Sequence, residues 1–116
     1  MRVLVIDDSA LTRKMIIRII EQEIENATFD EAEDGDAALK MLNSGDYDVF
    51  TIDYNMPGAN GEIVAIAAKT NCPNARICML TSQEEPEVQH RVERIGVRFL
   101  RKPDFQDELV TFIKTR

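Results

Sequence analysis

The chain has 116 residues, the size of one ordinary domain, and 44% of them are apolar. That content is enough for a core that buries about 65% of the surface of the unfolded chain. The 14 basic and 21 acidic residues give a net charge of -7, which opposes binding to nucleic acid backbones or to anionic membranes. We therefore expect one domain over residues 1–116 and no direct nucleic acid partner.

Cysteine use and hydropathy indicate the compartment. Cys72 and Cys78 are the two cysteines of the sequence, and they lack the CxxC spacing of redox and metal motifs. We interpret them as reduced structural thiols, as is usual in the cytosol. The N-terminus lacks the regions of a signal peptide, and no apolar run reaches the length of about 18 residues that a membrane span needs. We expect a soluble, cytoplasmic protein without membrane insertion.

The first half of the chain alternates short apolar runs with helical patterns. Strands are predicted near residues 2–6, 28–32 and 48–53, and a helix is predicted over about 35–43. The helix after the first strand repeats its apolar residues at a spacing of about 3.6, which predicts that this face packs on a sheet. The residues of this apolar face are Leu11, Met15, Ile16, Ile19, Ile20 and Ile24.

The second half continues the alternation. Helices are predicted over about 61–69 and 84–95, and strands near 76–80 and 97–100. The start of the second of these helices is ambiguous, because Ser82 and Glu85 form a capping-box pattern whereas Pro86 prefers the first helical position. The last helix has its apolar residues at helical spacing, and they are Phe105, Leu109, Phe112 and Ile113.

Strands separated by helices predict an α/β fold in which right-handed crossovers cover both faces of a parallel sheet. All strands of such a sheet end at one edge, and ligands bind there. Polar residues stand at four of the predicted ends. They are Asp7 and Asp8 after the first strand, Asp53 at the third, Thr81 at the fourth and Lys102 at the fifth.

Three carboxylates at one edge favour a metal site. Two carboxylates about 4 Å apart repel each other by about 4 kcal/mol at an effective dielectric constant of about 20, so the cluster needs a cation. Mg²⁺ suits it, because this hard ion takes oxygen ligands and keeps substrate phosphate oxygens in its shell. Asp53 is then a candidate nucleophile that carries a covalent phosphoryl group. Lys102 and the Thr81 hydroxyl could meet the transferred group.

Each of these residues also has a purely structural interpretation. Asp7 and Asp8 could cap the first helix and interact with its dipole. Asp53 could begin a turn, Lys102 could be a surface lysine, and Thr81 could be a hydroxyl at a strand end. The four features nevertheless occur together and in the order that one shared site requires, and this conjunction favours the functional interpretation.

The motifs together resemble the receiver domains of bacterial response regulators, most closely the single-domain chemotaxis type, over essentially all 116 residues. The resemblance implies a doubly wound five-stranded parallel sheet of the flavodoxin-like order 2-1-3-4-5 with five helices, and this order rests on the resemblance alone. The motifs that carry it are residues 3–9 (VLVIDDS), 33–35 (EDG) with 37–39 (AAL), 53–57 (DYNMP) with Gly61, 80–82 (LTS) and 99–103 (FLRKP).

The resemblance also implies roles for site residues. Asp53 would be the phosphoacceptor. Asp8, Asp53 and the carbonyl group of Asn55 would bind Mg²⁺ directly, and Asp7 would help through a water molecule. Family members also usually hold the bond between the lysine and the proline of the last motif in the cis form.

Two further residues would respond to the phosphoryl group. Thr81 would contact it, together with Lys102, and Phe99 would be the aromatic residue of the switch. The departures from the common pattern, at Asn60, Val97 and Arg98, concern the partner surface rather than the chemistry.

We therefore expect a phosphorylation-dependent signalling switch of a two-component system. A histidine kinase or a phosphotransfer protein would donate to Asp53, and the modified chain would change its affinity for an effector protein. The effector would bind the face of the fourth helix, fifth strand and fifth helix, and the protein would be a monomer. It would not be an enzyme beyond its own phosphorylation from phosphodonors and its own dephosphorylation.

Other functions are less well supported by the residues. A Mg²⁺-dependent phosphatase of the haloacid dehalogenase type would need an acid two residues after the nucleophile, where Asn55 stands. A flavodoxin-like electron carrier would need a phosphate-binding loop where Asp7 and Asp8 stand. A pseudo-receiver would typically have lost an acidic or lysine position. The receiver portion of a longer DNA-binding regulator stays open as an alternative.

Overall fold

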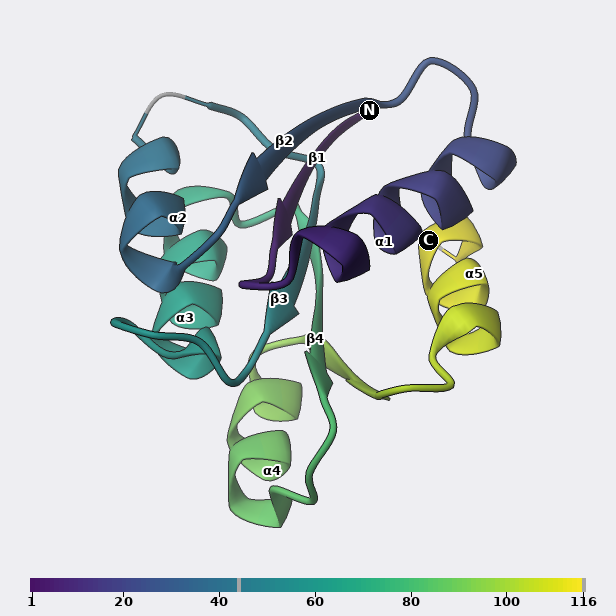
Figure 1. The fold of residues 1–116 in the computed structure, drawn as a ribbon. Coiled ribbons are helices and arrows are strands. Elements are labelled where there is room, and N and C mark those ends of the chain that lie inside the picture. The colour runs from purple at the N-terminus through teal and green to yellow at the C-terminus, as the bar shows by residue number, and fades with distance from the viewer. Residues whose placement is uncertain (44, 116) are drawn as a thin grey trace.

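The computed structural model describes residues 1–43 and 45–115, which form a parallel β-sheet with helices on both of its faces (Figure 1). Each strand is followed by a helix, as the alternation of sequence patterns predicts. The elements are β1 (Arg2–Ile6), α1 (Ala10–Glu23), β2 (Thr28–Ala32), α2 (Gly35–Met41), β3 (Val49–Asp53), α3 (Gly61–Asn71), β4 (Arg76–Thr81), α4 (Pro86–Arg94), β5 (Val97–Arg101) and α5 (Gln106–Lys114).

The strands lie in the order β2-β1-β3-β4-β5, which confirms the predicted topology. All neighbouring pairs are parallel. The three central strands are almost wholly buried, because helices cover them from both sides. The order places β1 and β3 side by side, and β4 next to β3, so that their C-terminal ends converge.

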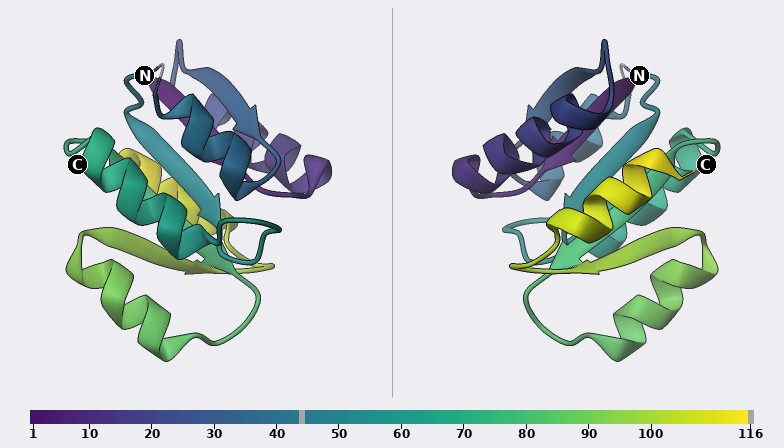
Figure 2. Two further views of the ribbon diagram at one scale, coloured as in Figure 1. Left: turned by 90° about the vertical axis from the view of Figure 1, so that its left-hand side faces the viewer. Right: turned by 90° about the vertical axis from the view of Figure 1, so that its right-hand side faces the viewer.

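Two apolar layers hold the helices to the sheet. α1 and α5 cover one face, and α2, α3 and α4 cover the other (Figure 2). Alternate residues of each strand serve the two layers: Phe50 and Ile52 face α2 to α4, whereas Val49 faces α1 and α5. All four apolar residues predicted for the last helix lie in the layer between the sheet and the helices α1 and α5; they are Phe105, Leu109, Phe112 and Ile113.

The expected apolar face of α1 is only partly correct. Ile16, Ile19 and Ile20 are buried against the sheet, but Leu11 is 70% exposed and Met15 is 46% exposed. The apolar face of α1 is therefore wider than the part of the helix that packs against the sheet and α5. Leu11 and Met15 instead line a surface hollow of about 290 Å³ beside α5.

The helix starts resolve one ambiguity. α4 begins at Pro86, and Glu85 occupies the N-cap position without a side-chain hydrogen bond, so the preference of proline for the first turn prevails over the capping-box pattern. α3 has a conventional cap instead, because the Asn60 side chain accepts from the N–H of Ile63 at 3.0 Å. The unusual Asn60 is thus a helix cap.

The remaining expectations from composition concern thiols and membranes. Both Cys72 and Cys78 are buried and unpaired, in agreement with their interpretation as structural thiols. None of the helices in the described part of the chain combines the length and the apolar character needed to cross a bilayer.

Candidate phosphoacceptor and metal site

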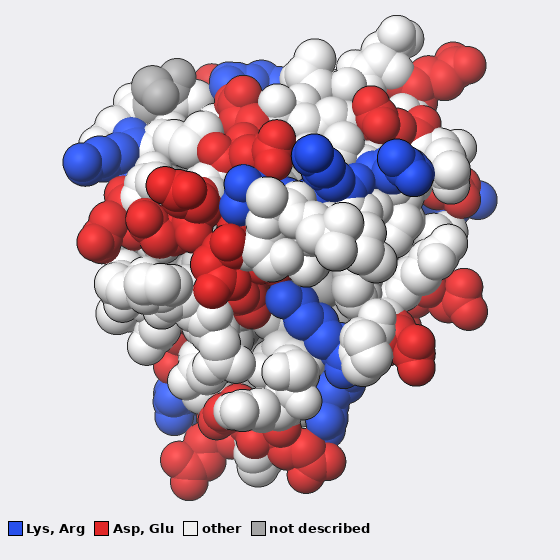
Figure 3. Space-filling model, viewed as in Figure 1, with Lys and Arg blue, Asp and Glu red and all other residues white. Residues whose placement is uncertain are grey.

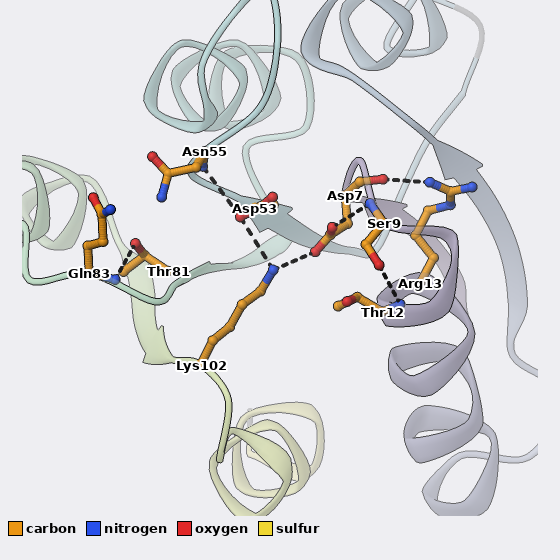
Figure 4. A network of polar contacts seen from close by, with 9 residues as sticks. All are labelled: Asp7, Ser9, Thr12, Arg13, Asp53, Asn55, Thr81, Gln83 and Lys102. Atoms are coloured by element: carbon orange, nitrogen blue, oxygen red, sulfur yellow. Dashed lines mark hydrogen bonds and ion pairs between the residues drawn. The ribbon is translucent and has the colours of Figure 1, made fainter.

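The sheet edge formed by the C-terminal strand ends brings the predicted site residues together. Asp53 is the last residue of β3, and Thr81 is the last residue of β4. Asp7 directly follows β1, and Lys102 directly follows β5. Since the strands are parallel and neighbouring, these four side chains meet at one place although they come from four segments (Figure 4).

Three carboxylates form the centre of the site. Oxygens of Asp7, Asp8 and Asp53 all lie within 4.8 Å of one another. Asp7 is 1% exposed and Asp53 is 5% exposed, whereas Asp8 is open to solvent. Acidic side chains also gather on the surface where β1 and β3 end (Figure 3). Such a set of hard oxygen donors, confined in partial burial, fits a divalent cation such as Mg²⁺.

Lys102 is the cation within this cluster. Its Nζ lies 2.8 Å from Oδ2 of Asp7 and 3.5 Å from Oδ1 of Asp53, so it stands between the two buried carboxylates (Figure 4). Burial alone would lower the pKa of Lys102, but the contacts with Asp7 and Asp53 outweigh it and raise the pKa. Lys102 therefore stays charged. The peptide bond between Lys102 and Pro103 is cis, as the resemblance implies.

Asp53 has the perturbed acidity of a functional carboxylate. Burial and the neighbouring charge of Asp7 raise its pKa to about 6, against a smaller lowering by Lys102. Its Oδ1 also accepts a long hydrogen bond of 3.4 Å from the N–H of Asn55. One lysine does not balance the carboxylates around it, and this imbalance is what a bound cation would relieve.

The capping interpretation of Asp7 and Asp8 is wrong. Ser9 is the N-cap of α1, and its hydroxyl accepts from the N–H of Thr12 at 3.2 Å. Asp7 instead accepts from the N–H of Ser9 at 2.9 Å through Oδ1 and from Lys102 through Oδ2. Both oxygens of Asp7 are thereby fixed in the site rather than used by the helix.

Arg13 is a supporting residue that the sequence did not reveal. Its guanidinium donates to the backbone carbonyl of Asp7 at 2.6 Å and forms an ion pair with Glu31 at 2.8 Å. It thus holds the turn after β1 to β2. The i, i+6 separation of Arg13 from Asp7 matches no recognised motif, so no local signal could have found it.

Thr81 lies on the other side of the site. It is fully buried, and its hydroxyl accepts from the N–H of Gln83 at 3.2 Å. Its backbone carbonyl accepts from the N–H of Lys102 at 2.8 Å, which ties the ends of β4 and β5 together. Phe99 is 8% exposed and packs in the layer beneath α3 and α4.

The loop after Asp53 is held close by Gly61. The N–H of Gly61 donates to the carbonyl of Tyr54 at 3.1 Å. A Cβ at this position would come within 2.6 Å of the carbonyl oxygen of Asp53 and the Cα of Tyr54. Only glycine permits this approach, which returns the chain to α3 and leaves Asn55 exposed at the mouth of the site.

Replacing Asp53 with asparagine should stabilise the chain at neutral pH. Because the folded-state pKa is raised from 3.8 to about 6, the folded chain loses stability as the pH rises through this window. In Asp53→Asn this loss disappears, so the variant should gain up to about 3 kcal/mol over the natural chain above pH 6 and almost nothing at about pH 4. Urea unfolding without divalent cations across this range measures the difference.

Asp34→Asn is the matched control, because Asp34 is not a member of the carboxylate cluster, and asparagine can keep its cap of α2. A pH-independent difference between Asp53→Asn and the natural chain would contradict the raised pKa.

Comparison with known proteins places this geometry in a family. Residues 3–114 match the model of the response regulator receiver domain. The chain is 32% identical over 110 residues to the probable transcriptional regulatory protein NarL of Mycobacterium tuberculosis, covering 94% of this chain and 51% of that protein. It is 31% identical over 106 residues to chemotaxis protein CheY-3 of Vibrio cholerae, covering 89% of this chain and 81% of that protein.

Solved structures agree with the sequence matches. The structure of Vibrio cholerae chemotaxis protein CheY4 has a TM-score of 0.81 and 27% identity, covering 97% of this chain and 95% of that chain. The chain spans about half the length of NarL and most of CheY-3. The chain therefore belongs to the family of response regulator receiver domains, which are phosphorylation-dependent signalling switches of two-component systems rather than enzymes in the main sense.

Proposed function

We propose that Asp53 accepts a phosphoryl group from a phosphohistidine of a histidine kinase or a phosphotransfer protein. A carboxylate oxygen of Asp53 forms the new P–O bond while the P–N bond to the donor histidine breaks and the imidazole takes up a proton. The observation that carries the proposal is the position of Asp53, which is buried at a strand end, close to the carboxylates of Asp7 and Asp8 and beside Lys102. Lys102 meets the charge of the transferred group as a point charge.

The carboxylate cluster holds Mg²⁺ in this proposal. When bound, the ion would neutralise negative charge on the carboxylate cluster and on the phosphoryl oxygens. Asp8, Asp53 and the carbonyl group of Asn55 would hold it directly. Asp7 would help through water, because its two oxygens already accept from Ser9 and Lys102.

Labelling by a small phosphodonor tests the acceptor. Incubation with acetyl phosphate and Mg²⁺ should add one phosphoryl group to Asp53, found by intact-mass and peptide mass spectrometry. Chelation of Mg²⁺ with EDTA and the substitution Asp53→Asn should each abolish the label, whereas Asp34→Asn should leave it unchanged. Equal labelling of Asp53→Asn would refute the assignment.

A protein donor has to cover the surface beside Asp53, and α1 begins there. The exposed Leu11 and Met15 lie on this helix with Lys14 and Arg18, around the hollow beside α5. An apolar patch with a cationic border suits a helical partner that carries the phosphohistidine and acidic side chains. We assign the donor to this side of the molecule.

Comparing two phosphodonors tests this docking. Leu11→Ala and Met15→Ala should each slow transfer from a phosphorylated histidine kinase by about tenfold, the effect of losing about 1.4 kcal/mol of apolar contact. Labelling by acetyl phosphate should not change. Ile66→Ala is the control, since Ile66 is 50% exposed on α3. The docking assignment fails if Leu11→Ala slows transfer from the kinase and labelling by acetyl phosphate equally, or if it slows neither.

The signal passes from Thr81 to Phe99. In the register of β4 and β5, Met79 pairs with Phe99 and Thr81 pairs with Arg101, so the side chains of Thr81 and Phe99 lie diagonally on the same face of the sheet. A phosphoryl group draws the Thr81 hydroxyl toward itself and frees space for Phe99. Because Phe99 is already buried, its response is a repacking in the core.

One hydrogen bond is worth about 1 kcal/mol, or about a fivefold shift of an equilibrium. An effector that prefers the phosphorylated packing must therefore supply the rest of the switch.

Thr81→Ala should accept the phosphoryl group without the switch. Its ¹H–¹⁵N NMR spectrum should show phosphorylation shifts near Asp53 but not around Phe99, because the hydroxyl that links them is gone. Ser82→Ala, which removes the adjacent exposed hydroxyl, should respond like the natural chain. Identical shifts around Phe99 in phosphorylated Thr81→Ala and the natural chain would exclude this route.

The effector binds the face of α4, β5 and α5. Arg91 of α4 forms a two-pronged ion pair with Glu62, at 2.6 and 2.9 Å, and its hydrogen bonds lower the pKa of Glu62. Glu62 follows Gly61 in the first turn of α3, so α4 is tied to the point where the loop after Asp53 ends. The exposed polar and charged residues of this face include Glu87, His90, Arg91 and Arg94 on α4 and Asp107, Glu108 and Lys114 on α5.

This mixed-charge surface suits a specific, salt-sensitive contact of a monomer with an effector protein. The chain itself then hydrolyses its acyl phosphate, with Asn55 beside the route of the attacking water. The alternative, that these residues are the receiver portion of a longer DNA-binding regulator, is favoured by one observation: the chain matches 51% of a protein described as a transcriptional regulator.

A further inference from the structure

A second hollow lies at the other end of the sheet from Asp53. It has a volume of about 320 Å³ and opens between the C-terminal ends of α3 and α5 and the starts of β4 and β5. Three cationic side chains line it, those of Lys69, Arg76 and Arg98, and within the described residues no acidic side chain does. The lining of the hollow is therefore positively charged, although the net charge of the chain is -7.

Arg76 is held in place by α5. One guanidinium nitrogen of Arg76 donates to the carbonyls of Phe112 at 3.0 Å, Ile113 at 3.1 Å and Thr115. The guanidinium carbon lies 5.8 Å from the centre of the Phe112 ring. The end of α5 lies beside the loop that leads from α3 into β4 (Figure 2). These three hydrogen bonds use one terminal nitrogen of Arg76. They do not involve the N–H groups on the other two guanidinium nitrogens.

Lys69 and Arg98 reach the hollow from other elements. Gly96 has a φ of 91°, and a Cβ built on it would lie 3.5 Å from Nζ of Lys69, so the ammonium group sits over the start of β5. Arg98 follows on β5 and is exposed. In residues 1–43 and 45–115, neither Lys69 nor Arg98 forms an ion pair with a carboxylate.

Asp48 is bonded to Arg76 through its backbone, but its carboxylate has another partner. The backbone carbonyl of Asp48 accepts from the N–H of Arg76, but the carboxylate of Asp48 accepts from the N–H of Arg2 at 2.7 Å. Three cationic residues from α3, β4 and β5 thus border one hollow, and within the described residues none of them is paired with a carboxylate. Such a grouping costs electrostatic free energy unless an anion of another molecule binds.

We propose that the hollow lined by Lys69, Arg76 and Arg98 binds a small multivalent phosphate, as free pyrophosphate or as the diphosphate of a nucleotide. A guanidinium fork and an ammonium group are the usual partners of phosphate oxygens. The net charge of -7 disfavours a long polyanion such as nucleic acid. The site lies about 16 Å along β4 from Thr81, so it is separate from the phosphoacceptor site.

NMR titration of the ¹⁵N-labelled chain of residues 1–116 tests the site. Pyrophosphate, inorganic phosphate and ADP are added separately without Mg²⁺, and sodium chloride at matched ionic strength is the blank. The amides of Ile77, Gly96 and Arg98 should shift and saturate with pyrophosphate, and those beside Asp53 should not.

Lys69→Gln and Arg98→Gln should each weaken pyrophosphate binding by about tenfold, the worth of one charge-assisted hydrogen bond. Arg76 is left intact because it holds the end of α5. Lys40→Gln is the matched control, since Lys40 and Lys69 occupy the last turns of α2 and α3. Only Lys69 lines the hollow.

The three ligands separate the two sources of phosphate. Tighter binding of ADP than of pyrophosphate supports a nucleotide, and the reverse supports a free polyphosphate. Shifts that match the sodium chloride blank, or Lys69→Gln and Arg98→Gln proteins that bind pyrophosphate as the natural chain does, would overturn the proposal.

Discussion

The contact on which the site depends is the ammonium group of Lys102 between the buried carboxylates of Asp7 and Asp53, at 2.8 and 3.5 Å. The carboxylate oxygens of Asp7 and Asp53 lie within 4.8 Å of each other. Without the ammonium group, the two charged carboxylates would repel each other by several kcal/mol, and one of them would take up a proton. With it, the site still carries excess negative charge, as the raised pKa of Asp53 shows. The lysine thus makes the carboxylate cluster compatible with the folded state, and the remaining negative charge favours binding of a divalent cation.

The parallel sheet connects this local contact to more distant parts of the structure. Lys102 is joined through its backbone to Thr81, and Thr81 shares a sheet face with Phe99. On the other side, Gly61 lets the loop after Asp53 fold back closely, and the next residue, Glu62, holds Arg91 of α4. Two sets of contacts therefore connect the surroundings of Asp53 to the surface of α4 and β5: one runs through Thr81, and the other through Glu62.

The two ends of β4 differ in electrostatic character. The C-terminal end adjoins the carboxylate cluster around Asp53, whereas the N-terminal end begins with Arg76 in a hollow bordered by Lys69 and Arg98. The same strand thus separates the carboxylate cluster from the cationic hollow. Neither group neutralises the other, because the strand holds them about 16 Å apart.

The sequence alone determined the strand ends and, with the family resemblance, the strand order, because apolar runs bounded by polar residues mark buried strands, which placed Asp53 and Lys102 correctly. Only the tertiary structure decided that Ser9, not Asp7, caps α1, and that Leu11 and Met15 face solvent. It also brought together the pair Glu62 and Arg91 and the cations Lys69, Arg76 and Arg98. The Ser9 cap is a local contact with Thr12, but the sequence offered Asp7 and Asp8 as equally good caps. The pair of Glu62 and Arg91 and the grouping of the three cations join segments far apart in the chain, so packing sets them and local patterns do not report them.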